Sequence, residues 1–367
     1  MRIILFAVLL AGLAQAQVPA IKYGVPIQTG PMDSVLLKDY QPESSLVLPE
    51  TRMSKARFPV IDVHSHDFMS NIKTAQDVAD WVKTMDTVGI ETSVVFIEAT
   101  GQEFENRAKL FLAYQGRFQV WCGLDTKDFD KPGYSQRAAA EVERCFRWGA
   151  RGVGEISDKG WGFQKERLPR DKRLHLDDPR LDAVWQKCAE LRIPVNIHVA
   201  DHPSCWRPLG PKQERTADFQ VFNLYGKDVP SYEELLARRD KLLARNPKTT
   251  FIFCHFSNQG NDFASLSRAL DKFPNLYVDL SARDYEIGRE PRAALRFLAK
   301  YSDRVLFGTD MGRDQAMYEG WWRLLETDDE YILGRMWWRE YGLNLPSAVL
   351  EPLYRGNARR LLNWQQP

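Results

Sequence analysis

The fold is decided by a repeating pattern that begins at Pro59-Val-Ile-Asp-Val-His-Ser-His66, a short run rich in apolar and β-branched residues. Runs of this length and composition are typical of buried strands. Seven more follow along the chain, at residues 92–97, 118–123, 152–156, 194–199, 250–255, 276–280 and 305–309. Between them, apolar residues recur every three or four positions, which predicts helices at residues 75–88, 136–148, 181–191, 232–245, 263–272 and 292–300.

Eight predicted strands that alternate with helices indicate an α/β protein with a parallel sheet, and eight is the number that closes a TIM barrel. A doubly wound sheet would instead carry a glycine-rich turn after its first strand. The sequence contains no such turn, no GxxxxGK[ST] phosphate loop and no GxSxG motif. We therefore predict a single-domain (β/α)8 barrel over residues 58–367, ending in a C-terminal helical extension.

The N-terminus has the layout of a secretory signal peptide. Arg2 precedes an apolar run from Ile3 to about Ala14, which closes on the small-residue pattern Ala14-Gln15-Ala16. An uncleaved membrane anchor is disfavoured, because about 12 apolar residues are too few for a bilayer that needs roughly 20. We predict cleavage after about Ala16, export to the periplasm or the extracellular space, and no membrane segment in the mature chain. The proline-rich residues 17–57 are predicted to form an extended arm.

The chain of 367 residues is nearly neutral, with 50 Lys and Arg against 49 Asp and Glu and a pI near 7.6. This balance argues against a basic nucleic-acid-binding protein. Hydrophobic residues make up 44% of the sequence, enough for a large core. The five cysteines are odd in number and show no clustered spacing, so we expect buried, unpaired thiols rather than a disulfide framework.

Ligand-type side chains fall where the predicted strands end. His64 and His66 are two residues apart in a strand, so both side chains point to the same side. A single histidine is also compatible with a hydrogen-bonded core position, but four of the six histidines lie at strand ends, together with two carboxylates. Imidazole and carboxylate groups bind zinc and related divalent ions. The sequence therefore predicts a metal site at the C-terminal mouth of the barrel, formed by His64, His66, Glu155, His198, His255 and Asp310.

The remaining histidines and the long loops are candidates for other roles. We expect His175 to be solvated, and His202 is a candidate for the pocket wall. Long connections follow strands four, five and eight, at residues 158–179, 201–230 and 314–346, and loops at this end of a barrel form the active site. The predicted substrate-binding residues are Arg283 and Arg313, which suit a carboxylate, and Trp161, Trp206 and Arg207.

The connection after strand eight is rich in tryptophan. Trp337 and Trp338 are interpreted as packing residues, because aromatic side chains mostly pack. For Trp321 and Trp322, packing and a role at the barrel mouth stay open as alternatives.

Five motifs follow one another along the chain: Asp62-Val-His-Ser-His66, Pro194-Val-Asn-Ile-His198, Phe253-Cys-His255, Gly308-Thr-Asp310 and Gly356-Asn-Ala-Arg-Arg-Leu-Leu362. In this order they resemble the amidohydrolase superfamily, and most closely its amidohydrolase-related branch, over about Phe58 to Asn363. That branch contains mononuclear decarboxylases of aminocarboxymuconate semialdehyde and of hydroxybenzoates, alongside lactonases and other hydrolases.

The resemblance implies that His64, His66 and Asp310 hold a divalent metal, with His198 joining them. Zinc is the expected ion, with manganese or iron as alternatives, and one or two ions are compatible with the pattern. His255 is implied to be either a second-metal ligand or a group that polarises the substrate. Two-metal members often carry a carboxylated lysine where this chain has Glu155, whereas TatD-type deoxyribonucleases carry a glutamate there. Glu155 therefore either bridges two metals or hydrogen-bonds a ligand histidine.

These ligands imply a metal-activated water, with Asp310 accepting its proton and His255 stabilising the developing oxyanion. The leading prediction is an exported metal-dependent hydrolase of a small ester, lactone or amide. The alternative is a non-oxidative, metal-dependent decarboxylase of an aromatic or muconate-type acid. A TatD-like nuclease and a non-catalytic binding protein are less favoured. The expected partner is a small-molecule substrate rather than a nucleic acid, and homo-oligomer formation stays open.

Overall fold

A computed structural model describes residues 21–22, 25–26, 30–114, 116–215, 220–334, 336 and 338–362. The predicted signal peptide at residues 1–16 and Trp337 lie outside the described residues. The chain separates into two compact units, Met1–Val47 and Leu48–Pro367. Among the described residues, no helix combines the length and the apolar character that a bilayer span requires.

The first unit contains only short elements. Strand β1 (Ile21–Lys22) pairs antiparallel with β2 (Val25–Pro26), and two 3-10 turns follow, η1 (Pro31–Ser34) and η2 (Leu37–Asp39). Every described side chain from residue 30 to residue 47 is exposed, so these residues form no core of their own.

Residues 48–57 belong to the second unit and are hydrogen-bonded to its later residues. The backbone N–H and the hydroxyl of Thr51 donate to the Asp329 carboxylate at 2.8 and 2.7 Å. The Arg57 N–H donates to Glu326 at 3.1 Å. This stretch, predicted as the end of the arm, therefore runs along the domain that contains the barrel.

All eight predicted strands are present in the second unit. They are β3 (Val60–His66), β4 (Ile90–Phe96), β5 (Phe118–Trp121), β6 (Val153–Asp158), β7 (Val195–Val199), β8 (Phe251–Phe253), β9 (Leu276–Asp279) and β10 (Val305–Leu306). They pair in parallel in the orders β3-β4-β5 and β10-β9-β8-β7-β6. Parallel bridges Cys122↔Val153 and Ser65↔Met311 join the two sheets at both edges, which confirms the α/β barrel.

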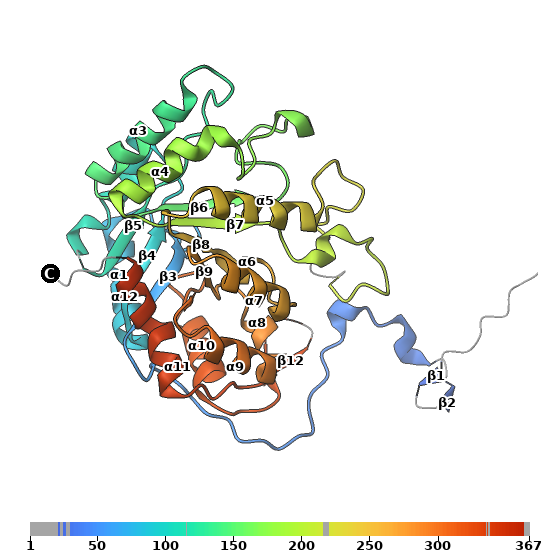
Figure 1. The fold of residues 1–367 in the computed structure, drawn as a ribbon. Helices are drawn as coiled ribbons and strands as arrows, with labels where there is room; N and C mark the ends of the chain where they lie inside the picture. Colours follow the sequence, from blue (N-terminus) through green and yellow to red (C-terminus); the bar gives the residue numbers. More distant parts are fainter. Residues whose placement is uncertain are drawn as a thin grey trace, which may run out of the picture. The chain divides into compact units, whose positions relative to one another are not determined.

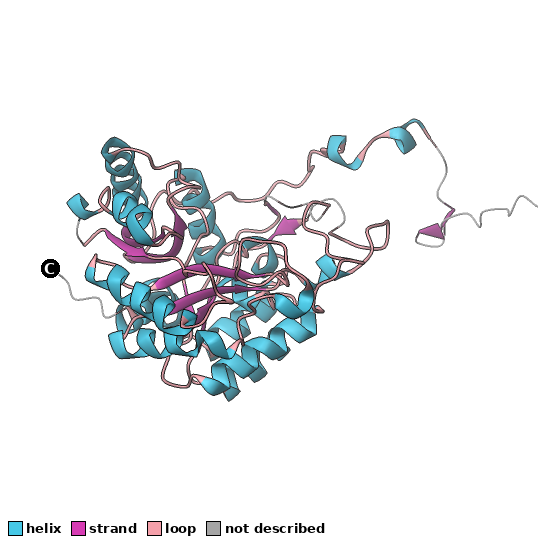
Figure 2. Ribbon diagram, turned by 90° about the horizontal axis from the view of Figure 1, so that it is seen from above, coloured by secondary structure: helices cyan, strands magenta, loops and turns pink. Residues whose placement is uncertain are grey.

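The helices lie around these strands (Figures 1 and 2). Several begin at sequence-encoded caps: the Thr74 hydroxyl accepts from the Asp77 N–H at the start of α1, and Ser231 with Glu234 does the same for α5. The longer helices are α1 (Ala75–Val88), α2 (Gly101–Ala108), α3 (Tyr134–Arg147), α4 (Asp182–Leu191), α5 (Tyr232–Arg245), α7 (Phe263–Lys272), α9 (Pro291–Lys300) and α10 (Gln315–Glu326).

The remaining elements are short. They are η3 (Leu112–Tyr114), η4 (Arg170–Lys172), η5 (Pro179–Leu181), η6 (Pro203–Trp206), α6 (Cys254–Ser257), α8 (Asp284–Ile287), the antiparallel pair β11 (Ile332–Leu333) and β12 (Arg339–Glu340), α11 (Ser347–Glu351), the π-helical turn η7 (Pro352–Gly356) and α12 (Asn357–Leu361).

Apolar side chains of the strands alternate between two clusters, as the pleat of a strand requires. Val95 and Phe253 belong to the large cluster between strands and helices, whereas the adjacent Phe96 and Ile252 face the lumen of the barrel. The lumen cluster, called the interior cluster below, consists of Ile61, Val63, Val94, Phe96, Trp121, Ile252, Leu306, Ala358 and Leu362. The last two residues come from the C-terminal extension, so that extension covers one end of the lumen.

Two interpretations from the sequence are settled by burial. Trp321 and Trp322 of α10 are packing residues, with 4% and 0% of their surface exposed and with their rings against Phe307. The five cysteines are buried and unpaired, as predicted.

Candidate metal centre

His64 and His66 project from β3 where its pairing with β4 is irregular. The register shifts between Asp62 and Ser65, and such a bulge adds a residue to one strand and turns its side chains. Val63 packs in the interior cluster, and the next side chain, His64, also faces the lumen. The Nε2 atoms of His64 and His66 lie 3.2 Å apart, so both histidines point to one place, as predicted.

Glu155 lies at a second irregularity, in β6. The register against β7 shifts between Val153 and Ile156. Gly154 makes room for this shift, because a Cβ there would lie 2.8 Å from the Cβ of Asn196. The Glu155 side chain then reaches the lumen, with Oε2 at 3.4 Å from His64 Nε2 and 3.3 Å from His66 Nε2.

Asp310 completes this group from the segment after β10. Its Oδ1 lies 3.0 Å from His66 Nε2 and 3.3 Å from His64 Nε2. Gly308 permits this approach, because a Cβ there would lie 2.8 Å from the Cβ of His64. The Asp310 side chain is 25% exposed while that of His64 is fully buried, so Asp310 forms the side of the group that is open to solvent.

The five separations that join the two histidines to each other and to the two carboxylates have the size expected between ligands of one divalent ion. Bonds of about 2.0–2.2 Å give edges of roughly 3.3–3.6 Å in a tetrahedron and roughly 2.8–3.1 Å in an octahedron. The measured separations run from 3.0 to 3.4 Å. Two imidazoles and two carboxylates also suit zinc, manganese and iron. His64, His66, Glu155 and Asp310 are called the first donor group below.

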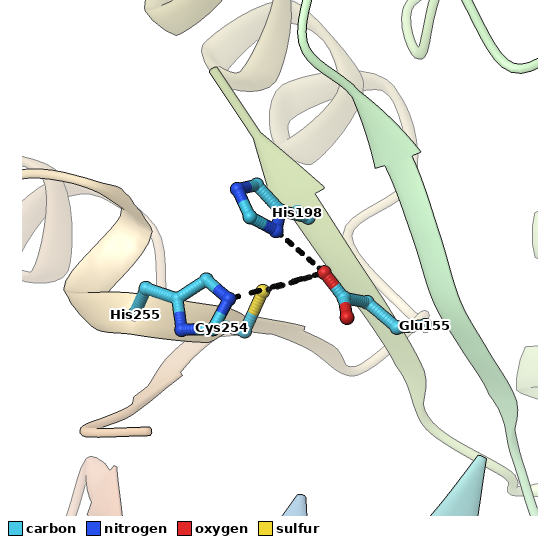
Figure 3. Close-up of side chains that lie close together, drawn as sticks. All are labelled: Glu155, His198, Cys254 and His255. Carbon is cyan, nitrogen blue, oxygen red and sulfur yellow. Dashed lines mark hydrogen bonds and ion pairs between the residues drawn. The ribbon is translucent and has the colours of Figure 1, made fainter. Parts of the chain in front are cut away.

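A second group of donors faces the other oxygen of Glu155 (Figure 3). From Glu155 Oε1, His198 Nδ1 lies at 2.6 Å, the Cys254 sulfur at 3.5 Å and His255 Nε2 at 3.9 Å. His198, Cys254 and His255 are called the second donor group below. Glu155 is therefore shared by both groups, which favours the bridging alternative for this residue.

His255 reaches this position because β8 ends at Phe253, two residues before the end of the predicted strand. The next residues have left-handed backbones, with φ of 58° at His255, 54° at Phe256 and 55° at Ser257. Each such residue costs roughly 1–2 kcal/mol when it is not glycine. Strain of this kind persists where the surrounding contacts impose it, and it concentrates at functional sites.

Each of the four histidines is also held by its other ring nitrogen. The pairs are His64 Nδ1 with Asp279 at 3.0 Å, His66 Nδ1 with Glu98 at 2.7 Å, His198 Nε2 with Asp201 at 3.1 Å and His255 Nδ1 with the Ser281 carbonyl at 2.7 Å. Partners of this kind fix the tautomer and the orientation of metal-binding imidazoles. Because a carbonyl only accepts, His255 carries its proton on Nδ1, and its Nε2 lone pair faces Glu155. This favours the ligand role for His255.

The carboxylates around the first donor group control its protonation. Burial by itself lowers the pKa of His64, but Asp279, Asp310 and Glu155 outweigh it and raise that pKa well above its ordinary value. Conversely, burial raises the pKa of Glu155, but His198 and the two histidines of β3 outweigh it and lower that pKa well below its ordinary value. The group therefore has an excess of negative charge that protons or a divalent cation neutralise.

His255 differs from the histidines of β3 in its charge. Burial, helped by the positive charges of Arg283 and His198, lowers the pKa of His255 to about 3. The ring is therefore neutral at pH 7, as a metal-binding imidazole must be.

The two arginines predicted to bind substrate lie in different surroundings. Arg283 hydrogen-bonds the Asn258 side chain, next to the left-handed segment that contains His255. Arg313 lies 3.5 Å from the Ser70 carbonyl and 3.4 Å from the Asp77 carboxylate. Of these two arginines, Arg283 is therefore the one whose positive charge helps to lower the pKa of a donor residue, His255.

The three other predicted substrate residues lie on the long loops. The Trp161 ring lies close to two guanidinium groups, with its centroid 3.8 Å from that of Arg167 and 4.8 Å from that of Arg173. Trp206 donates its indole N–H to the Pro230 carbonyl at 2.9 Å, and Arg207 is exposed. Their contact with substrate stays a prediction.

Three carboxylates that hold the histidines were missed by the sequence analysis: Glu98, Asp201 and Asp279. A usable signal was present, because Asp279 stands in the predicted strand Leu276-Tyr-Val-Asp-Leu280 and Glu98 directly follows the predicted strand that ends at Ile97. The same rule that identified the histidines, a polar residue at a strand end, applies to both.

The expectation for His175 is wrong, because this residue is buried, with 4% of its surface exposed. Its Nδ1 lies 2.9 Å from the Asp158 carboxylate, which also accepts from the N–H groups of Gly160 and Gly162. The pair therefore fixes the loop after β6. His202 is also buried, and its Nδ1 accepts from the Ser204 N–H at 3.2 Å at the start of η6.

A TIM barrel that gathers imidazoles and carboxylates at the C-terminal ends of its strands has the arrangement that metal-dependent enzymes of this fold use. The family model for amidohydrolases matches residues 61–364. The chain belongs to this amidohydrolase family.

Solved structures agree with the fold. An uncharacterized TIM-barrel protein from Bordetella bronchiseptica is 16% identical with a TM-score of 0.53, covering 83% of this chain and 99% of its own. The 2,6-dihydroxybenzoate decarboxylase from Rhizobium is 17% identical with a TM-score of 0.50, covering 85% and 99%. The 5-carboxyvanillate decarboxylase from Sphingomonas paucimobilis is 13% identical with a TM-score of 0.51, covering 84% and 100%. No curated protein matches the sequence.

Proposed function

We propose that this protein is a metal-dependent hydrolase of a small ester, lactone or amide. One observation carries the proposal: four buried histidines each turn one ring nitrogen toward Glu155 or Asp310 and have the other within 3.1 Å of a carboxylate or carbonyl oxygen. Burying so many ionisable groups is expensive unless a cation compensates their charge. Imidazoles oriented in this way are typical of metal ligands.

A divalent cation in this centre supplies Lewis acidity, which lowers the pKa of water to about 7 and polarises a carbonyl group. We propose Asp310 as the general base. Its side chain is 25% exposed, against 9% for Glu155, and the two histidines fix its Oδ1. Its other oxygen accepts the proton of the attacking water and returns that proton to the leaving group.

A second candidate is a non-oxidative decarboxylase. Two of the similar structures are decarboxylases by name. The positive charge of Arg283 acts on His255, so this guanidinium is the group that we expect to attract a substrate carboxylate. Hydrolysis is favoured because Glu155 joins two donor groups, as in two-metal hydrolase sites, whereas the decarboxylases implied by the resemblance are mononuclear.

The test begins with metal analysis of the purified protein for zinc, manganese and iron. Lactones, esters, amides and aromatic acids are then screened in isotopically labelled water. With water labelled in oxygen as ¹⁸O, hydrolysis transfers the label to the released acid, whereas decarboxylation releases carbon dioxide and takes only a proton from the solvent, so its organic product carries no ¹⁸O. The variant Cys188→Ser, altered in a buried thiol of α4, serves as control. The proposal fails if His66→Ala retains both the metal and the turnover.

Export is a separate part of the proposal and rests on the sequence of residues 1–16. Mass spectrometry of the protein recovered from a periplasmic fraction should find Gln17 at the N-terminus. Recovery of a chain that still begins at Met1 would contradict export with cleavage.

A further inference from the structure

We propose that Cys254 is a metal ligand, and that the second donor group binds a thiophilic divalent cation such as zinc in preference to manganese. The inference rests on the proposed metal-dependent function and adds to it. Within the described residues, Cys254 is the cysteine that shares a potential metal-binding group with histidines and a carboxylate.

The sulfur of Cys254 lies among the other donors of this group (Figure 3). It is 3.5 Å from Glu155 Oε1, and one donor atom from each of Glu155, His198, Cys254 and His255 lies within 4.8 Å of the others. Bonds of about 2.3 Å to sulfur and about 2.0–2.2 Å to oxygen give a tetrahedral edge of roughly 3.5–3.7 Å. The distance from the sulfur to the carboxylate oxygen therefore fits two ligands of one zinc ion.

The backbone explains how two neighbouring residues serve one group. In a regular strand, adjacent side chains point to opposite faces, so Cys254 and His255 would diverge. The left-handed φ of 58° at His255 removes that alternation, and both side chains then face Glu155. Two neighbouring ligands of one ion require a turn of this kind, because it brings the thiol and the imidazole to the same carboxylate. A thiol that served only for packing would not require a strained turn.

The outer contacts leave the donor atoms available. His198 uses Nε2 for Asp201, and His255 uses Nδ1 for Ser281, so their other nitrogens face Glu155. The 2.6 Å contact between His198 Nδ1 and Glu155 Oε1 is a hydrogen bond, which an ion bound between them replaces. The remaining contact of the Cys254 sulfur is the Ile197 carbonyl at 3.5 Å.

The two donor groups therefore differ in chemical softness. The first offers two imidazoles and two carboxylates, which accept manganese as well as zinc. The second adds a thiolate, which favours zinc and disfavours manganese. We expect zinc to persist in the second group when excess manganese displaces it from the first.

Two measurements on the full-length protein test the ligand. X-ray absorption at the zinc edge should detect sulfur at about 2.3 Å in the unmodified protein, and this needs no variant. Cobalt-loaded protein should show a sulfur-to-cobalt charge-transfer band in the near ultraviolet. That band should disappear in Cys254→Ser and remain in Cys188→Ser, since both thiols are fully buried but Cys188 lies on α4.

The variants also separate a ligand from a hydrogen-bonding thiol. Serine retains a donor for Glu155, so Cys254→Ser should lose zinc, about one equivalent per chain, only if the sulfur binds it. Zinc coordinated by nitrogen and oxygen alone, or a cobalt spectrum unchanged in Cys254→Ser, overturns the proposal. If that variant keeps all its metal and His66→Ala loses both metal and turnover, the ligand proposal fails while the hydrolase proposal stands. If the sulfur signal is found and no substrate is hydrolysed, the ligand proposal stands while the hydrolase proposal fails.

Discussion

The lumen of the barrel contains two regions of opposite character, although the same strands contribute to both. β3 supplies Ile61 and Val63 to the interior cluster, then His64 and His66 to the metal centre. β8 and the turn after it supply Ile252 to the first and Cys254 to the second. The interior cluster follows regular strand alternation, whereas the donors of β3, β6 and the turn after β8 emerge at register shifts or in left-handed backbone. In this chain, regular pairing builds the barrel, and departures from it position the chemistry.

The variant His66→Ala tests most directly whether the metal centre and the interior cluster are independent. This variant removes a donor and a ring contact with Phe96 but leaves every residue of the interior cluster in place, so the barrel should fold and its metal content should fall. Loss of the several kcal/mol that metal catalysis supplies corresponds to a decrease on the order of 10³-fold or more in kcat/KM. Metal analysis, circular dichroism and steady-state kinetics measure the three quantities. A variant that loses its fold together with its metal would show that the two regions are not separable.

The converse variant is Trp121→Ala. Trp121 is fully buried in the interior cluster on β5, a strand that supplies none of the donors described above. Truncating a buried tryptophan costs about 3–5 kcal/mol of the free energy of unfolding. Urea unfolding should detect this loss, while the folded fraction keeps its metal. Full stability with altered metal binding would reverse the assignment of roles.

Asp279→Asn tests the boundary between the two regions. Asp279 holds His64 Nδ1 at 3.0 Å and also accepts from the His255 N–H at 3.1 Å. Loss of the charge behind a ligand histidine typically reduces metal affinity or activity about 10–100-fold. Competition with a chelator gives the affinity of the folded protein. The free energy of unfolding should also fall, by about 1–3 kcal/mol, because the asparagine NH2 group would face N–H donors that the carboxylate accepts from. Unchanged affinity would mean that His64 is not oriented through Asp279.

The smallest expected effect lies outside both regions, at Asp329. Burial by itself raises the pKa of Asp329, but hydrogen bonds from Thr51 and Arg323 outweigh it and lower that pKa below its ordinary value. The unfolded chain then binds this proton more readily than the folded one. The stabilisation is therefore fully present above the unfolded pKa, about 3.9, and disappears as the pH falls through the lower folded value.

Asp329→Asn should therefore lower the free energy of unfolding at pH 7 by on the order of 1 kcal/mol, with metal content unchanged. The difference from the unmodified protein should shrink as the pH is lowered below about 3.9. Unfolding titrations at several pH values measure both. A difference that grows toward acid pH would show that the carboxylate does not act through Thr51 and Arg323.

The barrel could be predicted from the sequence because its signals are local. Helices α1, α5 and α7 coincide with the predicted ranges 75–88, 232–245 and 263–272, since caps and apolar periodicity are encoded within each segment. Each of the eight predicted strands is present, and each of its ends lies within three residues of the predicted end. The histidines at strand ends were identified by the same periodicity.

The relative placement of the donors could not be predicted in this way. The register shifts near His64 and Glu155 depend on how neighbouring strands pair, and the left-handed turn at His255 depends on contacts with other strands. Strand alternation alone would put Cys254 and His255 on opposite faces. His175 was misjudged for a related reason, because its partner Asp158 lies 17 residues away and the loop between them gives no periodic signal.

The position of Glu155 between the two donor groups has a thermodynamic consequence. Its single negative charge faces two sets of donors, through Oε2 on one side and Oε1 on the other. Two cations that share this carboxylate are thermodynamically linked, so the factor by which the first alters the affinity for the second equals the factor by which the second alters the affinity for the first. Metal titrations of the two groups should therefore show cooperativity of one sign, positive or negative, whichever group is filled first.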